Sequence, residues 1–322
     1  MDKKNTIVIV TGGKGFLGKQ VVGKLIASGY EVFIPDHKNY DLRKESDIKD
    51  MFFDFKTKYE WYYEQPNIIV LHLAAHGGGI GLNMKRPAEL FYDNIMMGTL
   101  MMHYSCLHNV KKYISIGTVC AYPKITPTPF KEDDIWMGYP EPTNAAYALA
   151  KKMALVQAQA YRKQYNFNAV YLIPVNMYGP FDSFDPDDSH VIPALIKKFY
   201  EAKKDNKEEV VCWGTGNVFR EFLYVEDCAD AINLALETYD SSEPVNIGTG
   251  KTISIYNLVK LIAKLMEYDG NIIWDVSKPD GQHLRQLDTS RAKEQFGFEA
   301  KTNLEDGLKK TIEWYKKERN AS

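Results

Sequence analysis

Three glycines near the N-terminus constrain the fold more than any other feature. The apolar run from Ile7 to Val10 shows no alternation, as expected of a parallel strand buried on both faces. Gly12, Gly15 and Gly18 follow at three-residue spacing and lead into a helical pattern. This spacing lets the backbone turn sharply and lets a pyrophosphate approach N–H groups at the helix N-terminus. The sequence therefore predicts a nucleotide-binding unit, and the flanking strand and helix disfavour the alternative, a glycine-rich turn without a ligand.

The composition indicates a globular chain with neither nucleic acid nor membrane as a partner. Its 322 residues carry 40 Lys plus Arg against 42 Asp plus Glu, so no basic surplus exists for nucleic acid. No apolar run approaches the ~20 residues of a membrane span, and no signal-like segment precedes the first strand, so we expect a cytoplasmic protein. Cys106, Cys120, Cys212 and Cys228 form no C-x-x-C pair, which favours reduced thiols and no metal site.

The end of the second predicted strand bears on the choice between NAD and NADP. Asp36 lies 18 positions after Gly18, close to the ~20 positions at which an acidic side chain meets the adenosine ribose. An aspartate there favours NAD(H), whereas Lys14, His37 and Lys38 could neutralise the 2′-phosphate of NADP(H). We favour NADP(H), and keep NAD(H) and a solvated loop of mixed charge as alternatives.

Small residues end the next predicted strand, Asn67–Leu73. Ala74 and Ala75 would let a flat cofactor lie against the backbone at the sheet edge where open α/β folds bind ligands. His76 follows them and is a candidate site residue, although a histidine in a glycine loop is more often a surface side chain. The long helical stretch after this loop carries Asn94 on an apolar background.

A tyrosine and a lysine four positions apart form the second strong signal. Tyr147 and Lys151 fall on one face of a predicted helix, so the hydroxyl and the ammonium can point into one cleft. An adjacent ammonium and an oxidised nicotinamide favour the phenolate of a tyrosine, whose ordinary pKa is ~10. Thr118, after a predicted parallel strand, can hold or pass the proton. Surface helices also carry this spacing, but the glycine turn and the strand-end hydroxyl favour a catalytic set.

These motifs resemble those of the extended short-chain dehydrogenase/reductases, which have a Rossmann domain, T-G-x-x-G-x-x-G and a Ser/Thr, Tyr, Lys set. The resemblance spans the whole chain and narrows to the GDP-L-fucose synthases, which epimerise C3 and C5 of GDP-4-keto-6-deoxymannose and reduce C4. The stretches that carry it are Ala74–Ile80, Cys120–Lys124, Glu141–Asn144, Asn176–Pro180, Ser189–Leu195, Arg220–Phe222 and Ser277–Gly281.

The resemblance implies an NADPH-dependent enzyme with two further catalytic residues. A 4-keto group acidifies the protons on C3 and C5, so two side chains on opposite sides of the sugar can invert these centres. Cys120 and His190 resemble that pair, although a buried cysteine and a loop histidine are individually ordinary. A cysteine base needs a pKa lowered by a nearby cation or an imidazolium, and His190 could supply that charge.

One stretch departs from the family pattern. Gly117-Thr118-Val119-Cys120 stands where GDP-L-fucose synthases usually have Gly-Ser-Ser-Cys. The hydroxyl is kept, so reduction should survive, while the altered pocket leaves a deoxyhexose or a 6-deoxy-heptose as the substrate. A reductase that acts only on C4 of a sugar epimerised by another enzyme is the alternative. A redox-sensing regulator on the same fold would not need the tyrosine and the lysine.

The full predicted site follows from the residues and the resemblance together. The cofactor set is Gly12, Lys14, Gly15, Phe16, Leu17, Gly18, Asp36, His37, Lys38, Leu73, Ala74, Ala75, Asn94, Lys151, Pro174, Asn176, Met177 and His190. The set for the GDP-linked 4-keto-6-deoxy-sugar is His76, Asn176, Val191, Trp213, Arg220, Lys278 and Asp280. Arg220 offers a planar fork for phosphate or ribose oxygens, and Trp213 a flat apolar surface, although a salt bridge and a core tryptophan are the plain alternatives.

We therefore predict an α/β fold, a Rossmann-type doubly wound parallel sheet with a smaller C-terminal substrate-binding domain. Residues 1–178 form the NADP(H)-binding domain, to which 220–247 return, and residues 179–219 and 248–322 form the GDP-sugar-binding domain. We also expect a homodimer and a role in capsule or lipopolysaccharide biosynthesis.

Overall fold

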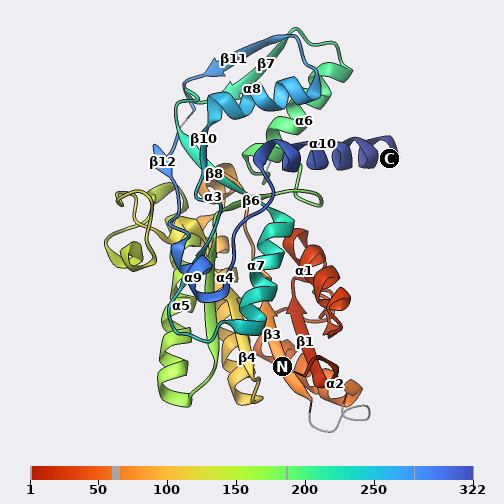
Figure 1. Cartoon of the computed structure of the whole chain (residues 1–322), viewed down its shortest axis with the longest axis vertical. Coiled ribbons are helices and arrows are strands. Elements are labelled where there is room, and N and C mark those ends of the chain that lie inside the picture. The colour runs from red at the N-terminus through yellow and green to blue at the C-terminus, as the bar shows by residue number, and fades with distance from the viewer. Residues whose placement is uncertain (1, 60–65, 186–187, 279, 322) are drawn as a thin grey trace.

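The larger part of the molecule is built on a six-stranded parallel sheet. The computed structural model describes residues 2–59, 66–185, 188–278 and 280–321 and is drawn in Figure 1. The strand order is β2–β1–β3–β4–β5–β9, and every neighbouring pair is parallel. The strands are β1 (Thr6–Thr11), β2 (Glu31–Phe33), β3 (Asn67–His72), β4 (Lys112–Ile116), β5 (Ala169–Pro174) and β9 (Val245–Ile247). The order reverses at β1, which confirms the predicted Rossmann-type sheet and places a ligand crevice at the carboxyl ends of β1 and β3.

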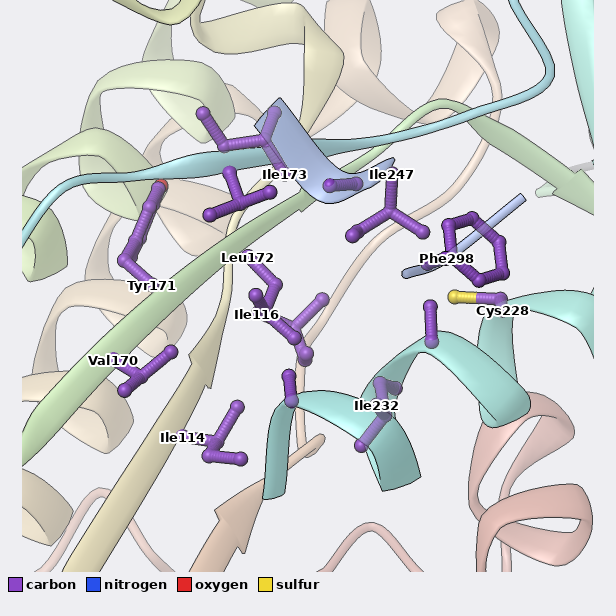
Figure 2. Close-up of a cluster of buried hydrophobic side chains, with 14 of the residues drawn as sticks. Ile114, Ile116, Val170, Tyr171, Leu172, Ile173, Cys228, Ile232, Ile247 and Phe298 are labelled. Carbon is purple, nitrogen blue, oxygen red and sulfur yellow. The ribbon is translucent and has the colours of Figure 1, made fainter. Parts of the chain in front are cut away.

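Helices cover both faces of this sheet. On one face α1 (Phe16–Ala27) packs against α7 (Val225–Thr238), and on the other α2 (Glu45–Tyr59), α4 (Pro87–Leu107) and α5 (Ala145–Tyr165) lie side by side. Figure 2 shows side chains of β4 and β5 meeting Ile232 and Cys228 of α7, with Phe298 closing the cluster beside the Cys228 sulfur. Both faces of β1 and β5 are buried, which explains why these strands read as continuous apolar runs.

The smaller part of the molecule, at the top of Figure 1, has two short sheets and its own apolar core. The strand β8 (Phe219–Tyr224) pairs with β6 (Asn176–Tyr178), β10 (Thr252–Ser254) and β12 (Leu284–Arg285), and β7 (Glu209–Trp213) pairs with β11 (Asn271–Asp275). Three helices pack on them, α6 (Val191–Lys204), α8 (Ile255–Met266) and α10 (Leu304–Ala321). Residues 220–247 were predicted to return to the larger sheet. Within this range β9 pairs in the larger sheet and α7 packs on it, whereas β8 pairs in the smaller sheet.

Short elements complete the fold. They are α3 (Ile80–Lys85), α9 (Ser290–Phe296) and four 3-10 helices, Lys3–Asn5, Val119–Ala121, Glu132–Trp136 and Pro142–Asn144. The second strand ends at Phe33, so Asp36 lies in the following loop rather than at the strand end. Within the described ranges, none of the helices combines the length and the apolar character that a bilayer crossing requires.

The glycine turn is as tight as its spacing predicts. Gly12 has φ +69° and lies so close to the chain after β3 that a Cβ there would come within 2.8 Å of the Ala74 nitrogen. Gly15 caps the N-terminus of α1 and donates its N–H to the Gly12 carbonyl at 2.9 Å. A Cβ on Gly18 would overlap that same carbonyl oxygen. The turn therefore presents the free N–H groups of α1 to the crevice without a side chain in front of them.

A pair of glycine substitutions in α1 tests this packing. Gly18→Ala should destabilise the fold by about 1–3 kcal/mol, because the new methyl group meets the backbone and not a flexible side chain. Gly23→Ala is the matched control, since an added Cβ there meets nothing within 4 Å, and it should stabilise the helix by about 0.5–1 kcal/mol. The free energy of unfolding in urea measures both. Equal values for the two variants would contradict the account of the turn.

Candidate active site

A cleft at the carboxyl ends of β1 and β3 has the features of a dinucleotide site. It is lined by Gly12, Gly13, Lys14, Gly15, Phe16, Leu17, Gly18, Pro35, His37, Tyr40, Asp41, Leu42, Arg43, Leu73, Ala74, Ala75, His76, Gly77, Asp93, Met97, Ile116, Gly117, Tyr147, Lys151 and Met177. The bare glycine turn at the N-terminus of α1 forms a cradle that a Cβ on Gly12 or Gly18 would disrupt. A pyrophosphate fits this cradle, because the helix N-terminus offers N–H donors and a positive dipole end.

Lys14 and His37 line this cleft, whereas Asp36 and Lys38, which were predicted with them to hold the cofactor, do not. The Lys14 ammonium lies 2.5 Å from the Asp36 carboxylate, which also accepts the Lys38 backbone N–H at 3.0 Å. The hydrogen bond from Lys14, followed by that from Lys38, lowers the pKa of Asp36 to about 2. Asp36 is therefore ionised, and Lys14 neutralises it. The sequence predicts that Asp36 favours the ribose of NAD(H) and Lys14 the 2′-phosphate of NADP(H). In the structure these two side chains form an ion pair with each other.

Most of the residues predicted to bind the sugar line a second cavity, which we name the sugar cavity and describe below. His76 lines only the cofactor cleft, so its predicted contact with the sugar is not supported by the geometry. Its ring Nδ1 lies 2.7 Å from the Asp93 carboxylate. Asn94 holds the His76 backbone by two hydrogen bonds. Its side-chain N–H donates to the His76 carbonyl at 2.7 Å, and its side-chain oxygen accepts the His76 N–H at 3.2 Å. Asn94 is buried behind the loop and lines neither cavity. Asn94 therefore fixes the backbone of His76, which lines the cofactor cleft, and does not itself line that cleft.

The predicted catalytic set lies where the two cavities meet. Tyr147 lines both of them, Lys151 lines the cofactor cleft, and Thr118 lines the sugar cavity. Burial, followed by the nearby Cys120 charge, raises the pKa of Tyr147, while a hydrogen bond with Thr118 lowers it. Burial also lowers the pKa of Lys151 to about 8. Burial is the largest influence on the pKa of Tyr147 and raises it, opposite in direction to the shift expected from an ammonium and a nicotinamide, so the phenol keeps its proton at neutral pH.

A second cavity of about 640 Å³ opens on the other side of Tyr147. Predicted residues that line it are Thr118, Cys120, Tyr147, Pro174, Asn176, Met177, His190, Val191, Trp213, Arg220 and Asp280. Pro174, Asn176 and His190 were predicted to hold the cofactor, but of the two cavities they line this one. Met177 lines both. The cavity therefore brings the epimerase candidates Cys120 and His190 together with Thr118 and Tyr147, while Lys151 lines only the cofactor cleft.

The surroundings of Cys120 differ from the prediction. Its sulfur accepts the Asn144 side-chain N–H at 3.2 Å and faces an Arg285 guanidinium nitrogen at 3.6 Å. Desolvation by the cavity walls lowers the pKa of His190, so its imidazole is neutral at pH 7. Of the two sources of positive charge that the sequence left open, an imidazolium at His190 is therefore not supported, and the Arg285 guanidinium is the cation beside the sulfur. Arg285 lies 165 residues from Cys120, so no spacing signal could have identified it.

The far end of the cavity has the chemistry of a nucleotide site. Trp213 is 53% exposed and is flanked by the ammonium groups of Lys198 and Lys278, 5.6 and 5.5 Å from the ring centroid. Lys278 lies over the outer ring face and does not line the cavity, whereas Lys198, which sequence reasoning missed, does. Arg220 donates to the Asp280 carbonyl at 3.0 Å, and the Asp280 carboxylate accepts two hydrogen bonds from Thr215 at 2.8 Å.

Comparison with known proteins agrees with this geometry. The model of the NAD dependent epimerase/dehydratase family matches residues 8–248. The chain belongs to this family. It is an enzyme of the short-chain dehydrogenase/reductase type, and the resemblance inferred from the motifs is confirmed.

Several full-length relatives refine the position of the chain within the epimerase/dehydratase family. GDP-L-fucose synthase 1 of Arabidopsis thaliana is 38% identical over 318 residues, which cover 98% of this chain and 95% of the relative. The GDP-L-fucose synthase of Escherichia coli (strain K12) is 34% identical, with 96% of each chain covered. The crystal structure of a GDP-6-OMe-4-keto-L-xylo-heptose reductase from C. jejuni is similar with a TM-score of 0.88 at 27% identity, covering 98% of this chain and 99% of that one.

The buried lysine predicts a pH limit for reduction. Because burial lowers the pKa of Lys151 to about 8, its ammonium is lost as the pH rises through that value. The pKa of Tyr147 is raised, so the tyrosine keeps its proton over the same range. The kcat/KM for ketone reduction should be level up to pH 7 and fall above pH 8, by about tenfold per pH unit. A stopped-flow series at constant ionic strength measures it, and a plateau that extends to pH 10 would argue against a role for the Lys151 charge.

Proposed function

We propose that this enzyme is an NADPH-dependent epimerase/reductase of a GDP-4-keto-6-deoxy-sugar, which inverts C3 and C5 and then reduces C4. The observation that carries the proposal is that Cys120 and His190 line one cavity with Thr118 and Tyr147. Relatives named GDP-L-fucose synthase match nearly the full chain, which supports a GDP-sugar as the substrate class. The substrate itself is a deoxyhexose or a 6-deoxy-heptose.

Each residue has a defined task in the proposed reaction. Cys120, as a thiolate, removes the proton from the carbon next to the ketone, and the electron pair moves to the ketone oxygen. His190, in the minor imidazolium form that its lowered pKa leaves, returns a proton from the opposite side and becomes neutral. Thr118 and Tyr147 hold that oxygen by hydrogen bonds throughout. Bound NADPH supplies the hydride for C4. Tyr147 then donates its proton to the new alkoxide, and Lys151 stabilises the negative charge that remains on the tyrosine.

NADP(H) is the cofactor in this proposal. A GDP-L-fucose synthetase from Naegleria fowleri, 26% identical with a TM-score of 0.86, has been solved bound to NADP. Lys14 is 62% exposed, so its ammonium can swing from Asp36 to a 2′-phosphate at little cost. Residues His37 and Lys38 would add to that positive field, whereas Asp36 opposes it and leaves room for NAD(H) as a poorer alternative.

The cavity residues beyond the catalytic set would hold the GDP moiety. Arg220 and Lys198 would meet the diphosphate, and Trp213 would stack on the guanine or ribose. Burial, followed by the neighbouring Arg285, lowers the pKa of Arg220 to about 10, so it stays charged at pH 7. The hydrogen bond from Arg220 to the Asp280 carbonyl orients its guanidinium. Asn176 and Val191 would line the sugar itself.

The domain division and the assembly are part of the same proposal. Residues 1–178 would bind the cofactor, with 220–247 returning, and residues 179–219 and 248–322 would bind the GDP-sugar. The enzyme would act in the cytoplasm as a homodimer. Exposed apolar side chains on the adjacent helices α4 and α5, namely Phe91, Tyr92, Met153 and Val156, support the dimer. Capsule or lipopolysaccharide biosynthesis would use its product.

A dedicated C4 reductase is the second candidate function. The observation that favours it is the similarity to C. jejuni structures named as heptose reductases, including a GDP-mannoheptose C4 reductase at 27% identity and a TM-score of 0.86. In such an enzyme Cys120 and His190 would only shape the sugar cavity. The Thr118 and Val119 side chains in place of two serines would then be part of a pocket adapted to the larger sugar.

Deuterium exchange separates the two functions. In D₂O without NADPH, the wild type should wash deuterium into C3 and C5 of a GDP-4-keto-6-deoxy-sugar, as followed by NMR. Cys120→Ser should lose most of this exchange, because a hydroxyl is a much weaker base than a thiolate. His190→Asn should stop the inversion. A substrate that is already epimerised should still oxidise NADPH in both variants, since Tyr147 and Lys151 are untouched.

The wild-type enzyme alone can contradict the bifunctional proposal. If it exchanges no deuterium but consumes NADPH with the epimerised ketone, the bifunctional proposal fails and the C4 reductase stands. Loss of NADPH consumption in both cysteine and histidine variants would show instead that these side chains are needed to bind the sugar.

A further inference from the structure

Arg285 occupies a position that neither the sequence motifs nor the proposed chemistry explains. It ends β12, and its guanidinium Nη1 lies 3.6 Å from the Cys120 sulfur. The Asn144 side chain donates to the same sulfur at 3.2 Å. Two N–H donors thus converge on one sulfur atom, and donors of this kind favour the thiolate over the thiol.

The guanidinium of Arg285 is fixed in this position by its neighbours. Its Nε donates to the Gln282 side-chain oxygen at 2.9 Å, and Gln282 in turn donates to the Lys124 carbonyl at 2.9 Å. The pairing of β12 with β8 sets Arg285 directly opposite Arg220. Because the register and two hydrogen bonds define the direction of the side chain, its approach to Cys120 is built into the fold.

Two guanidinium groups interact electrostatically with Cys120, that of Arg285, which contacts the sulfur, and that of Arg220. Arg220 and Arg285 repel each other, and a negative Cys120 raises the pKa of Arg220, as do Asp280 and Glu141. Tyr147 also faces Cys120 but is protonated at neutral pH. His190 stays neutral in its desolvated position. A thiolate would therefore relieve the repulsion between the two guanidinium groups.

We propose that Arg285 is a positioning residue that holds Cys120 as a thiolate aimed into the sugar cavity. This inference rests on the proposed function for its catalytic meaning. The thiolate forms an S–H bond while the sugar C–H bond breaks, and the electron pair passes to the ketone oxygen. Arg285 contacts the sulfur, and through it sets the fraction of the enzyme that is ready to remove a proton.

Alkylation of Cys120 by iodoacetamide tests the inference without substrate. Only thiolates react, and the modified Cys120 peptide can be followed by mass spectrometry from pH 6 to pH 10. In Arg285→Met the rate at pH 7 should fall by about tenfold to a hundredfold, the usual range for one charged hydrogen bond. It should approach the wild-type rate at pH 10, where both thiols ionise. Arg285→Lys should restore most of the rate, because it restores a cation.

Matched variants separate this effect from a general change in the cavity. Lys124→Met removes a cation whose ammonium pairs with Glu141 at 3.4 Å and not with the sulfur, and it should alkylate like the wild type. Gln282→Ala frees the guanidinium without removing it, and it should show a smaller loss than Arg285→Met. This second variant keeps the test available if Arg285→Met does not fold, as judged by circular dichroism.

The outcomes are distinct. Equal alkylation profiles for Arg285→Met and the wild type would overturn the role of Arg285, whatever the enzyme does to its substrate. A depressed profile together with lost deuterium exchange and intact ketone reduction would support it. A depressed profile in an enzyme whose wild type exchanges no deuterium would support the thiolate and reject the epimerase function. A normal profile with a raised KM alone would assign Arg285 to substrate binding instead.

Discussion

The active site depends on the placement of Tyr147 in the wall between two cavities. The segment after β4 brings Gly117 against the Tyr171 ring, where any Cβ would overlap that ring. The Tyr171 hydroxyl then donates to the Lys151 carbonyl at 2.9 Å, which ties the sheet to α5. Since α5 carries both Tyr147 and Lys151, this packing fixes the reductive pair relative to the strand ends. The cofactor cleft and the sugar cavity can therefore share one proton donor.

Burial away from water determines which of the side chains in this wall carry a proton at neutral pH. It keeps Tyr147 protonated, brings the pKa of Lys151 to about 8 and leaves His190 neutral. A protonated tyrosine suits the reductive direction, in which an alkoxide must receive a proton. The cation beside the Cys120 sulfur comes from the smaller part of the molecule, where β12 carries Arg285. In the proposed reaction, reduction and epimerisation would therefore use side chains from different elements of the fold.

The sequence predicted the parts of the site whose chemistry is local. The strand–turn–helix at Gly12 to Gly18 and the helical face of Tyr147 and Lys151 follow from spacing, because backbone periodicity alone decides them. Arg285 could not be predicted, since its approach to Cys120 depends on the pairing of β12 with β8 and not on any motif. The positive charge considered for His190 could not be judged from the sequence either, because the burial that lowers the pKa of its side chain depends on the tertiary fold.

The central claim is that Tyr147 donates the proton that completes reduction, and single-turnover kinetics on Tyr147→Phe test it most directly. The phenylalanine ring keeps the packing, so NADPH fluorescence should report binding close to that of the wild type. The rate of NADPH oxidation with a saturating GDP-4-keto-sugar should fall by about 10²–10⁴-fold, the range expected when one general acid is removed. A rate within a few fold of the wild type would contradict the account.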